Sequence, residues 1–257
     1  MESTAPEKLR ASEFARQIHD QLVPLGSRFS YFFTGIPFGE EDVKEYLEDP
    51  IQALSPALRK LLPKVAIVLV PYIERGAPGD KPLEDVVSFE RPAPKRQIWV
   101  STTVTEDGPV LLFGLHDHDV GEYHYLLYRS LAAVAADILP AEAREQFAGI
   151  LRDELTAGVH GEVDEESWEA KQALIRRQRN VRRKTKGFTK YARQALIDTL
   201  TLYLHGICCD IDIETGPRQL ASRHLRRRLE LLQSLYPPPE GYAVFPEDLN
   251  HAAKRAK

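Results

Sequence analysis

Alternating polar and apolar positions dominate the first half of the chain. Residues 97–104 alternate, with Val100, Thr102 and Val104 on one side, and the apolar run 110–113 follows Asp107-Gly108. Alternation with a period of two on both sides of an Asp-Gly pair is typical of a β-hairpin. Another run, 65–70, is apolar throughout and rich in β-branched residues. It predicts a strand that is buried on both faces and central in its sheet.

Further elements in this half follow from shorter patterns. Strands are expected at 28–33 and 86–89, and a helix at 11–22 carries apolar residues at helical spacing. Two short helical pieces are expected at 40–47 and 56–62. The first 115 residues therefore supply about five strands.

Helical periodicity takes over after residue 120. We expect helices at roughly 121–138, 141–157, 164–186, 189–206 and 217–235. Strands that precede helices along the chain favour an α+β fold over alternating βα units. The prediction is a mixed, mostly antiparallel sheet from the N-terminal half, packed against a helical C-terminal half.

Length and composition favour one compact domain. The chain has 257 residues, of which 43% are hydrophobic and 28% charged, enough apolar material for one large core or two small ones. We expect a single domain over 1–250, sheet-rich at 25–115 and helix-rich at 120–236. The polar tail 251–257 should be frayed.

Several features point to a soluble cytoplasmic protein. The N-terminus lacks the basic and apolar regions of a signal peptide, and the longest apolar run, 65–73, is far short of the ~20 residues of a membrane helix. Both cysteines, Cys208 and Cys209, are adjacent, which excludes a disulfide framework. A net charge of −4 gives no general attraction to nucleic acid or membranes, so we expect neither as a partner.

Residues 114–124 hold three of the eight histidines and three carboxylates. On a continuing strand, His116 and His118 would share one face, and a tight turn at Gly121 would bring His124 back toward them. Three imidazoles suit a zinc-like ion, with Glu122 as general base toward a metal-bound water. The sequence therefore predicts a metal-dependent hydrolase with zinc as its possible cofactor and a small molecule or peptide as substrate.

The same residues also allow a structural interpretation. Asp119 can cap the following helix through its side chain, with Glu122 at the position of a capping-box acid. The segment is then a polar turn, and the alternative function is a non-catalytic interaction or structural protein. A second copy of the chain, in a homo-oligomer, is one candidate partner for such a protein.

Two further segments carry chemistry-bearing side chains. The helix expected near 191–206 contains Asp198 and His205, which in one interpretation find hydrogen-bond partners within the core. In the other, the helix passes Gly206, and Cys209 and Asp212 extend the same face with a spacing that suits zinc ligands. A basic run without acids spans 171–193, preceded by an acidic block at 162–169. We interpret the basic run as a solvated face, or as a contact with the acidic block of a neighbouring subunit.

Common signatures for nucleotide binding, serine hydrolysis and zinc proteolysis are absent from the sequence. His116-x-His118 with Asp119 resembles the HxHxD core of metallo-β-lactamase-type hydrolases, but Asp119 comes one residue early and the following His is missing. His160-Gly161-Glu162 is similar to the H-x-E of zinc deaminases without the P-C-x-x-C that should follow, and we reject it.

The segment 128–134 resembles the active-site helix of zincin metallopeptidases in its spacing. Arg129 and Ala133 stand in the places of the two His ligands, and Ser130 stands in that of the Glu base. A degenerate zincin-like fold without its metal would have this spacing, and so would an ordinary amphipathic helix.

Overall fold

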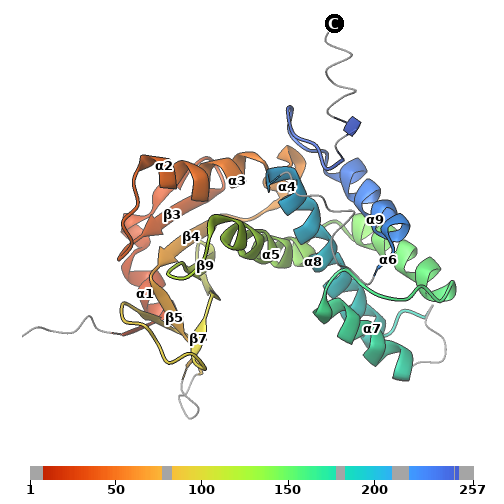
Figure 1. Ribbon diagram of the computed structural model, residues 1–257, viewed down its shortest axis with the longest axis horizontal. Coiled ribbons are helices and arrows are strands. Elements are labelled where there is room, and N and C mark those ends of the chain that lie inside the picture. The colour runs from red at the N-terminus through yellow and green to blue at the C-terminus, as the bar shows by residue number, and fades with distance from the viewer. Residues whose placement is uncertain (1–7, 77–82, 178–182, 210–219, 246, 249–257) are drawn as a thin grey trace, which may run out of the picture. The chain divides into compact units, whose positions relative to one another are not determined.

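The computed structural model describes residues 8–76, 83–177, 183–209, 220–245 and 247–248 (Figure 1). Strands fill the N-terminal half and helices the C-terminal half, which confirms the predicted α+β class. The chain divides into two compact units, Met1–Asp49 with Leu62–Leu126 and Pro50–Leu61 with Leu127–Lys257. Each unit is described by itself, and the single domain over 1–250 stays a prediction. The expected tail, 251–257, lies outside the described residues.

A five-stranded mixed sheet forms the larger sheet of the first unit. Its order is β2 (Val23–Leu25), β3 (Phe29–Phe33), β4 (Val65–Val70), β9 (Gly108–Gly114) and β8 (Val100–Thr105). The three inner strands are parallel, and the two outer strands pair antiparallel with their neighbours. The predicted β8–β9 hairpin and the central position of β4 are both confirmed.

A second, four-stranded antiparallel sheet was not predicted. It has the order β1 (Leu9–Arg10), β6 (Val86–Ser88), β5 (Tyr72–Glu74) and β7 (Gln97–Ile98). The chain passes from β4 into β5 at Pro71, whose missing N–H interrupts the ladder, and from β7 into β8 at Trp99. The expectation of one mixed sheet from the N-terminal half was therefore wrong, because apolar runs show where strands lie but not which strands pair.

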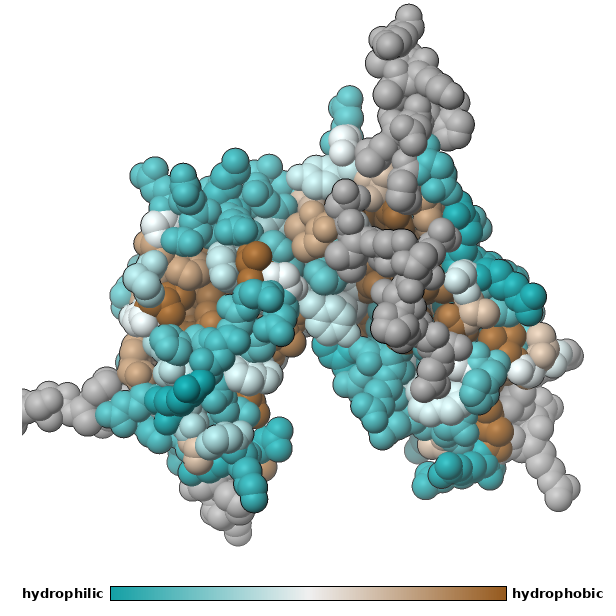
Figure 2. All heavy atoms as spheres, viewed as in Figure 1, coloured by the Kyte–Doolittle hydropathy of each residue, from teal (hydrophilic) through white to brown (hydrophobic). Residues whose placement is uncertain are grey.

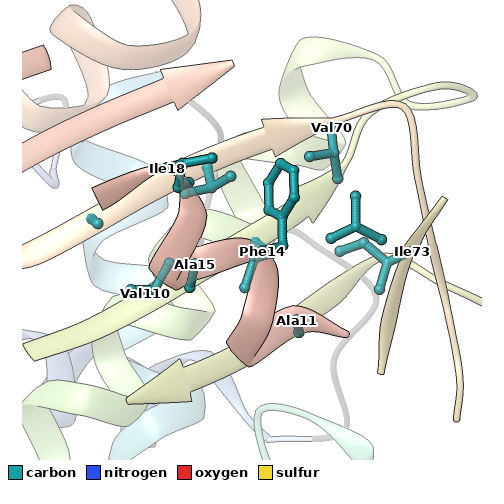
Figure 3. Packing of buried hydrophobic residues seen from close by; sticks show 11 residues of the cluster. Ala11, Phe14, Ala15, Ile18, Val70, Ile73 and Val110 are labelled. Carbon is teal, nitrogen blue, oxygen red and sulfur yellow. The ribbon is translucent and has the colours of Figure 1, made fainter. Parts of the chain in front are cut away.

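Residues of the first unit pack on both faces of the five-stranded sheet. One face packs with α1 (Ala11–Gln17), where Phe14 and Ile18 lie among alternate residues of β4 and β9 (Figure 3). On the other face, the Phe113 ring lies 5.3 Å from that of Tyr123, which in turn lies 5.2 Å from that of Tyr46. All six residues of β4 are buried, as predicted.

Two glycines allow close approach of backbones around this sheet. Gly108 has φ +140°, and a Cβ there would lie 2.2 Å from the carbonyl oxygen of Lys64. At Gly114 a Cβ would lie 3.1 Å from the backbone nitrogen of Ile73 on β5. A side chain at either position would separate the strands that lead to the candidate site.

The helices follow the predicted order. Short helical turns are η1 (His19–Gln21), α2 (Glu40–Val43), the π-helix η2 (Lys44–Glu48), α3 (Asp49–Gln52) and α4 (Pro56–Leu61). The longer helices are α5 (Val120–Ile138), α6 (Ala141–Thr156), α7 (Glu165–Arg177), α8 (Lys186–Cys209) and α9 (Ser222–Leu235).

Helix α8 is the core element of the second unit. Residues 196–204 are all buried, and α6, α7 and α9 all contact α8. The helix continues through Gly206, because Gly206 and Ile207 are themselves buried and their packing outweighs the ~1 kcal/mol helix penalty of glycine. The strand expected at 210–214, with Asp212, lies outside the described residues.

Candidate functional site

The histidine-rich segment begins with a turn, not with a continuing strand. Strand β9 ends at Gly114, and the His118 N–H donates to the Leu115 carbonyl at 3.1 Å. Asp117 has φ +122°, a conformation that is uncommon for a residue with a side chain. Its carboxylate accepts hydrogen bonds from Arg91 and, at 3.3 Å, from Gln97, and the hydrogen bond from Arg91 lowers the pKa of that carboxyl. The prediction that His116 and His118 share a strand face is therefore wrong.

Asp119 begins helix α5. Its Oδ1 accepts the Glu122 N–H at 2.8 Å, and its carbonyl accepts the Tyr123 N–H at 3.1 Å. This is the geometry of an N-cap, which satisfies backbone donors that the first turn leaves without helical partners. The capping interpretation of Asp119 is confirmed.

Glu122 and His118 form a carboxylate–imidazole pair. His118 Nδ1 lies 2.8 Å from Glu122 Oε2, four positions further along the chain. The His118 ring meets Trp99 edge to face at a centroid distance of 4.1 Å, and its Nε2 is buried without a hydrogen-bond partner among the described residues. The carboxylate fixes the orientation of the imidazole and favours a proton on Nδ1.

The other two histidines have different neighbours. His116 is exposed and its ring lies 4.9 Å from that of Tyr72. His124 is buried, its Nε2 lies 3.0 Å from the Glu45 carbonyl oxygen, and burial lowers its pKa. Potential ligand atoms of His116, His118 and His124 do not come within 4.8 Å of one another as a group. The structure thus pairs His118 with Glu122 only, and the zinc assignment stays a prediction.

The second unit contains a group of carboxylates that the sequence did not single out as a site. Oxygens of Asp164, Glu166 and Asp198 all lie within 4.8 Å of one another. Arg129 lies among them, with Nη1 at 3.3 Å from Asp198 and 3.6 Å from Asp164, and Nη2 at 2.6 Å from Glu166. Oxygen ligands at this spacing suit a hard cation, and the guanidinium supplies positive charge in that place.

Asp198 is the buried member of this group. It accepts hydrogen bonds from the Ser167 N–H at 3.1 Å and from the Gln194 amide at 2.8 Å, besides its contact with Arg129. Burial raises the pKa of Asp198 in spite of these donors. The expectation that Asp198 is satisfied within the core is confirmed, with these three residues as its partners.

A second charge network is fully buried. Arg228 on α9 contacts the carboxylates of Glu154 and Glu162, and Lys171 Nζ lies 3.1 Å from Glu162 and 2.8 Å from the Gly161 carbonyl. The Tyr191 hydroxyl donates to Glu162 as well. Two carboxylates thus face two cations, so the network is closed and electrically balanced. Glu162 belongs to the segment rejected as a deaminase signature, and its role here is structural.

Neither cysteine forms a disulfide. The hydrogen bond with the Cys208 side chain and burial both raise the pKa of the Cys209 thiol. A raised pKa keeps the thiol protonated at neutral pH, which disfavours nucleophilic attack by Cys209.

Comparison with known proteins gives no match to a family model, a curated protein or a solved structure. Among the helices that the structure describes, none combines the length and apolar composition needed to span a bilayer.

Proposed function

We propose that this protein is a non-catalytic interaction protein whose α5 helix is zincin-like but has lost its metal centre. The observation that carries the proposal is the contact of Arg129 with Asp198 and Glu166. Arg129 occupies the place of a His ligand in the zincin-like spacing, and its guanidinium faces the carboxylates that would otherwise attract a cation.

The chemistry of the substituted residues supports this proposal. A guanidinium is always protonated in proteins and has no lone pair to give to a metal, so Arg129 cannot act as a ligand. Ser130, in the place of the Glu base, has no carboxylate, and Ala133, in the place of the second His, has no donor atom. The ion pair between Arg129 on α5 and Asp198 on α8 therefore connects the two helices in place of a shared metal ion.

The polar residues near 116–124 also have structural tasks. Asp119 caps α5, Asp117 is bound by Arg91, and His124 bonds to the Glu45 carbonyl. Such contacts stabilise a turn and a helix start, and they leave few groups for proton transfer to a substrate.

Metal content tests the proposal directly. Protein purified without a His tag should contain far less than one zinc per chain by elemental analysis. A strong chelator should leave the thermal midpoint unchanged, because a ligand that is not bound contributes nothing to stability. One zinc per chain, with a midpoint that falls on chelation, would overturn the proposal.

A gain-of-metal variant tests the zincin-like geometry. Arg129→His with Ala133→His places two imidazoles four residues apart on α5, beside Asp198. The double variant should bind one zinc per chain in a competition assay with a chromophoric chelator. Adding Asp198→Asn should weaken that binding, and Arg129→His alone is the matched control. A double variant that binds zinc no better than this control would contradict the zincin-like arrangement.

The predicted metal-dependent hydrolase is the second candidate, and the His118–Glu122 pair favours it. The buried Nε2 of His118 has no partner among the described residues, and a carboxylate on the other ring nitrogen is typical of metal-ligating histidines. If this candidate is right, His116→Ala with His118→Ala should lower zinc content and thermal stability together.

A further inference from the structure

Helices α7 and α8 enclose a groove on the surface of the second unit. It has a volume of about 700 Å³. Glu166, Ala170, Ala173 and Arg177 of α7 line one side, and Gly187 and Lys190 of α8 line the other. Figure 2 shows a largely hydrophilic surface over α7 in this view. The groove lining combines the apolar residues Ala170, Ala173 and Leu174 with the charged residues Glu166, Glu169, Arg177 and Lys190.

Six residues of α7 line the groove, and four of them, Glu166, Ala170, Ala173 and Arg177, form a symmetric pattern. These four follow at intervals of four, three and four, which places them on one face of the helix. The acid and the arginine lie at equal distances from the midpoint between positions 171 and 172, and so do the two alanines. If a second α7 packs antiparallel with its midpoint opposite this one, Glu166 of each copy lies opposite Arg177 of the other. The contact then contains two equivalent ion pairs.

The four side chains are available for such a contact. Ser167, Lys171 and Leu174 take the core side of α7, whereas Ala173 and Arg177 are exposed. The Glu166 side chain is 52% exposed although it also contacts Arg129. Arg177 has no ion-pair partner among the described residues. Alanine at the two central positions lets helix axes approach closely, which strengthens the flanking ion pairs.

We infer that a second copy of this chain occupies the groove, as an isologous two-fold dimer with antiparallel α7 helices. Charge complementarity selects this occupant. The groove is lined by two acids, Glu166 and Glu169, and two bases, Arg177 and Lys190, so it has no net attraction for an acidic or a basic partner. On α7, Glu166 and Arg177 exchange places when the helix is reversed, so each meets the opposite charge in a second copy. The inference rests on the proposed function and names the partner of that interaction protein.

Sedimentation of the untagged full chain tests the inference. The wild type should sediment at twice the chain mass of 29.1 kDa. Arg177→Glu should raise the dissociation constant by at least about tenfold, because two-fold symmetry places the repulsion at both ends of the contact. Arg176→Glu is the matched control, since it makes the same charge change at an exposed residue of α7 outside the groove, and it should remain dimeric.

Charge exchange tests the register. Glu166→Lys and Arg177→Glu should each be monomeric alone, whereas an equimolar mixture should form a heterodimer in which both ion pairs are restored. Ala173→Arg should also weaken the dimer, by separating the helices without using the charged pair. Circular dichroism should show that each variant keeps the wild-type helix content.

Three results would overturn the inference. They are a wild type of 29.1 kDa at every concentration, equal weakening by Arg176→Glu and Arg177→Glu, and a mixture that stays monomeric. None of these results bears on metal content, so failure of the dimer is distinguishable from failure of the proposed function.

Discussion

Arg228 Nη1 lies 2.7 Å from Glu162 Oε2, and the two residues are separated by 66 positions in the chain. Both side chains are completely buried. Transfer of an isolated charge into a protein interior is costly, so each of these groups depends on the other for its place in the core. Glu154 contacts Arg228 and Lys171 contacts Glu162, so the four buried groups have no net charge.

Removal of this guanidinium should strongly destabilise the second unit. Arg228→Met leaves two carboxylates buried without their main cation, and we expect a loss of about 3–5 kcal/mol in the free energy of unfolding. Arg227→Met is the control, because Arg227 is half-exposed and pairs with Asp153 at the surface. That change should cost about 0.5 kcal/mol or less. Urea titration of both variants checks the difference, and equal losses would contradict the buried network.

The same network should make stability sensitive to acid. Burial raises the pKa of Glu162, but the charge and hydrogen bonds of Arg228, with Lys171 and Tyr191, outweigh it and hold that pKa below its usual value of 4.5. A carboxyl with a lowered folded-state pKa contributes stability that is complete above pH 4.5 and is lost as the pH falls through the lowered pKa. The stability difference between wild type and Glu162→Gln should therefore narrow at acid pH. Urea titrations over a pH series measure it, and a constant difference throughout the acid range would refute the assignment.

The N-cap of α5 should stabilise the protein through its hydrogen bond, and this contribution can be separated from that of the Asp119 charge. Asp119→Ala removes the acceptor of the Glu122 N–H and should cost about 1 kcal/mol, whereas Asp119→Asn keeps an acceptor and should cost much less. Thermal unfolding of the two variants gives the comparison. An Asn variant as unstable as the Ala variant would show that charge, not capping, is what matters at this position.

The cysteine pair should be slow to react. With its pKa raised by Cys208 and by burial, Cys209 should be alkylated at pH 8 at least about tenfold more slowly in the folded protein than in denaturant. The mass of the protein under non-reducing conditions should equal that calculated for the chain with both cysteines as free thiols. Equal alkylation rates, or a mass lower by about two hydrogens, would count against this description.

Local patterns along the chain account for most of the secondary structure. The β8–β9 hairpin follows from alternation around Asp107-Gly108, and the long helices follow from helical spacing, because both periodicities depend on neighbours close in the chain. The N-cap at Asp119 is equally local. A zincin-like spacing on α5 is also visible in the sequence, at Arg129 and Ala133.

Tertiary structure decided which charged and polar groups meet. The sequence by itself determined an α+β chain with a central apolar strand, a helix near 191–206 and a polar segment at 114–124. It did not distinguish buried Arg228 from exposed Arg227, nor did it reveal that Arg129 lies beside Asp198, 69 positions away. Strand pairing and ion pairing between distant residues depend on how whole elements pack, and no short-range periodicity encodes that choice.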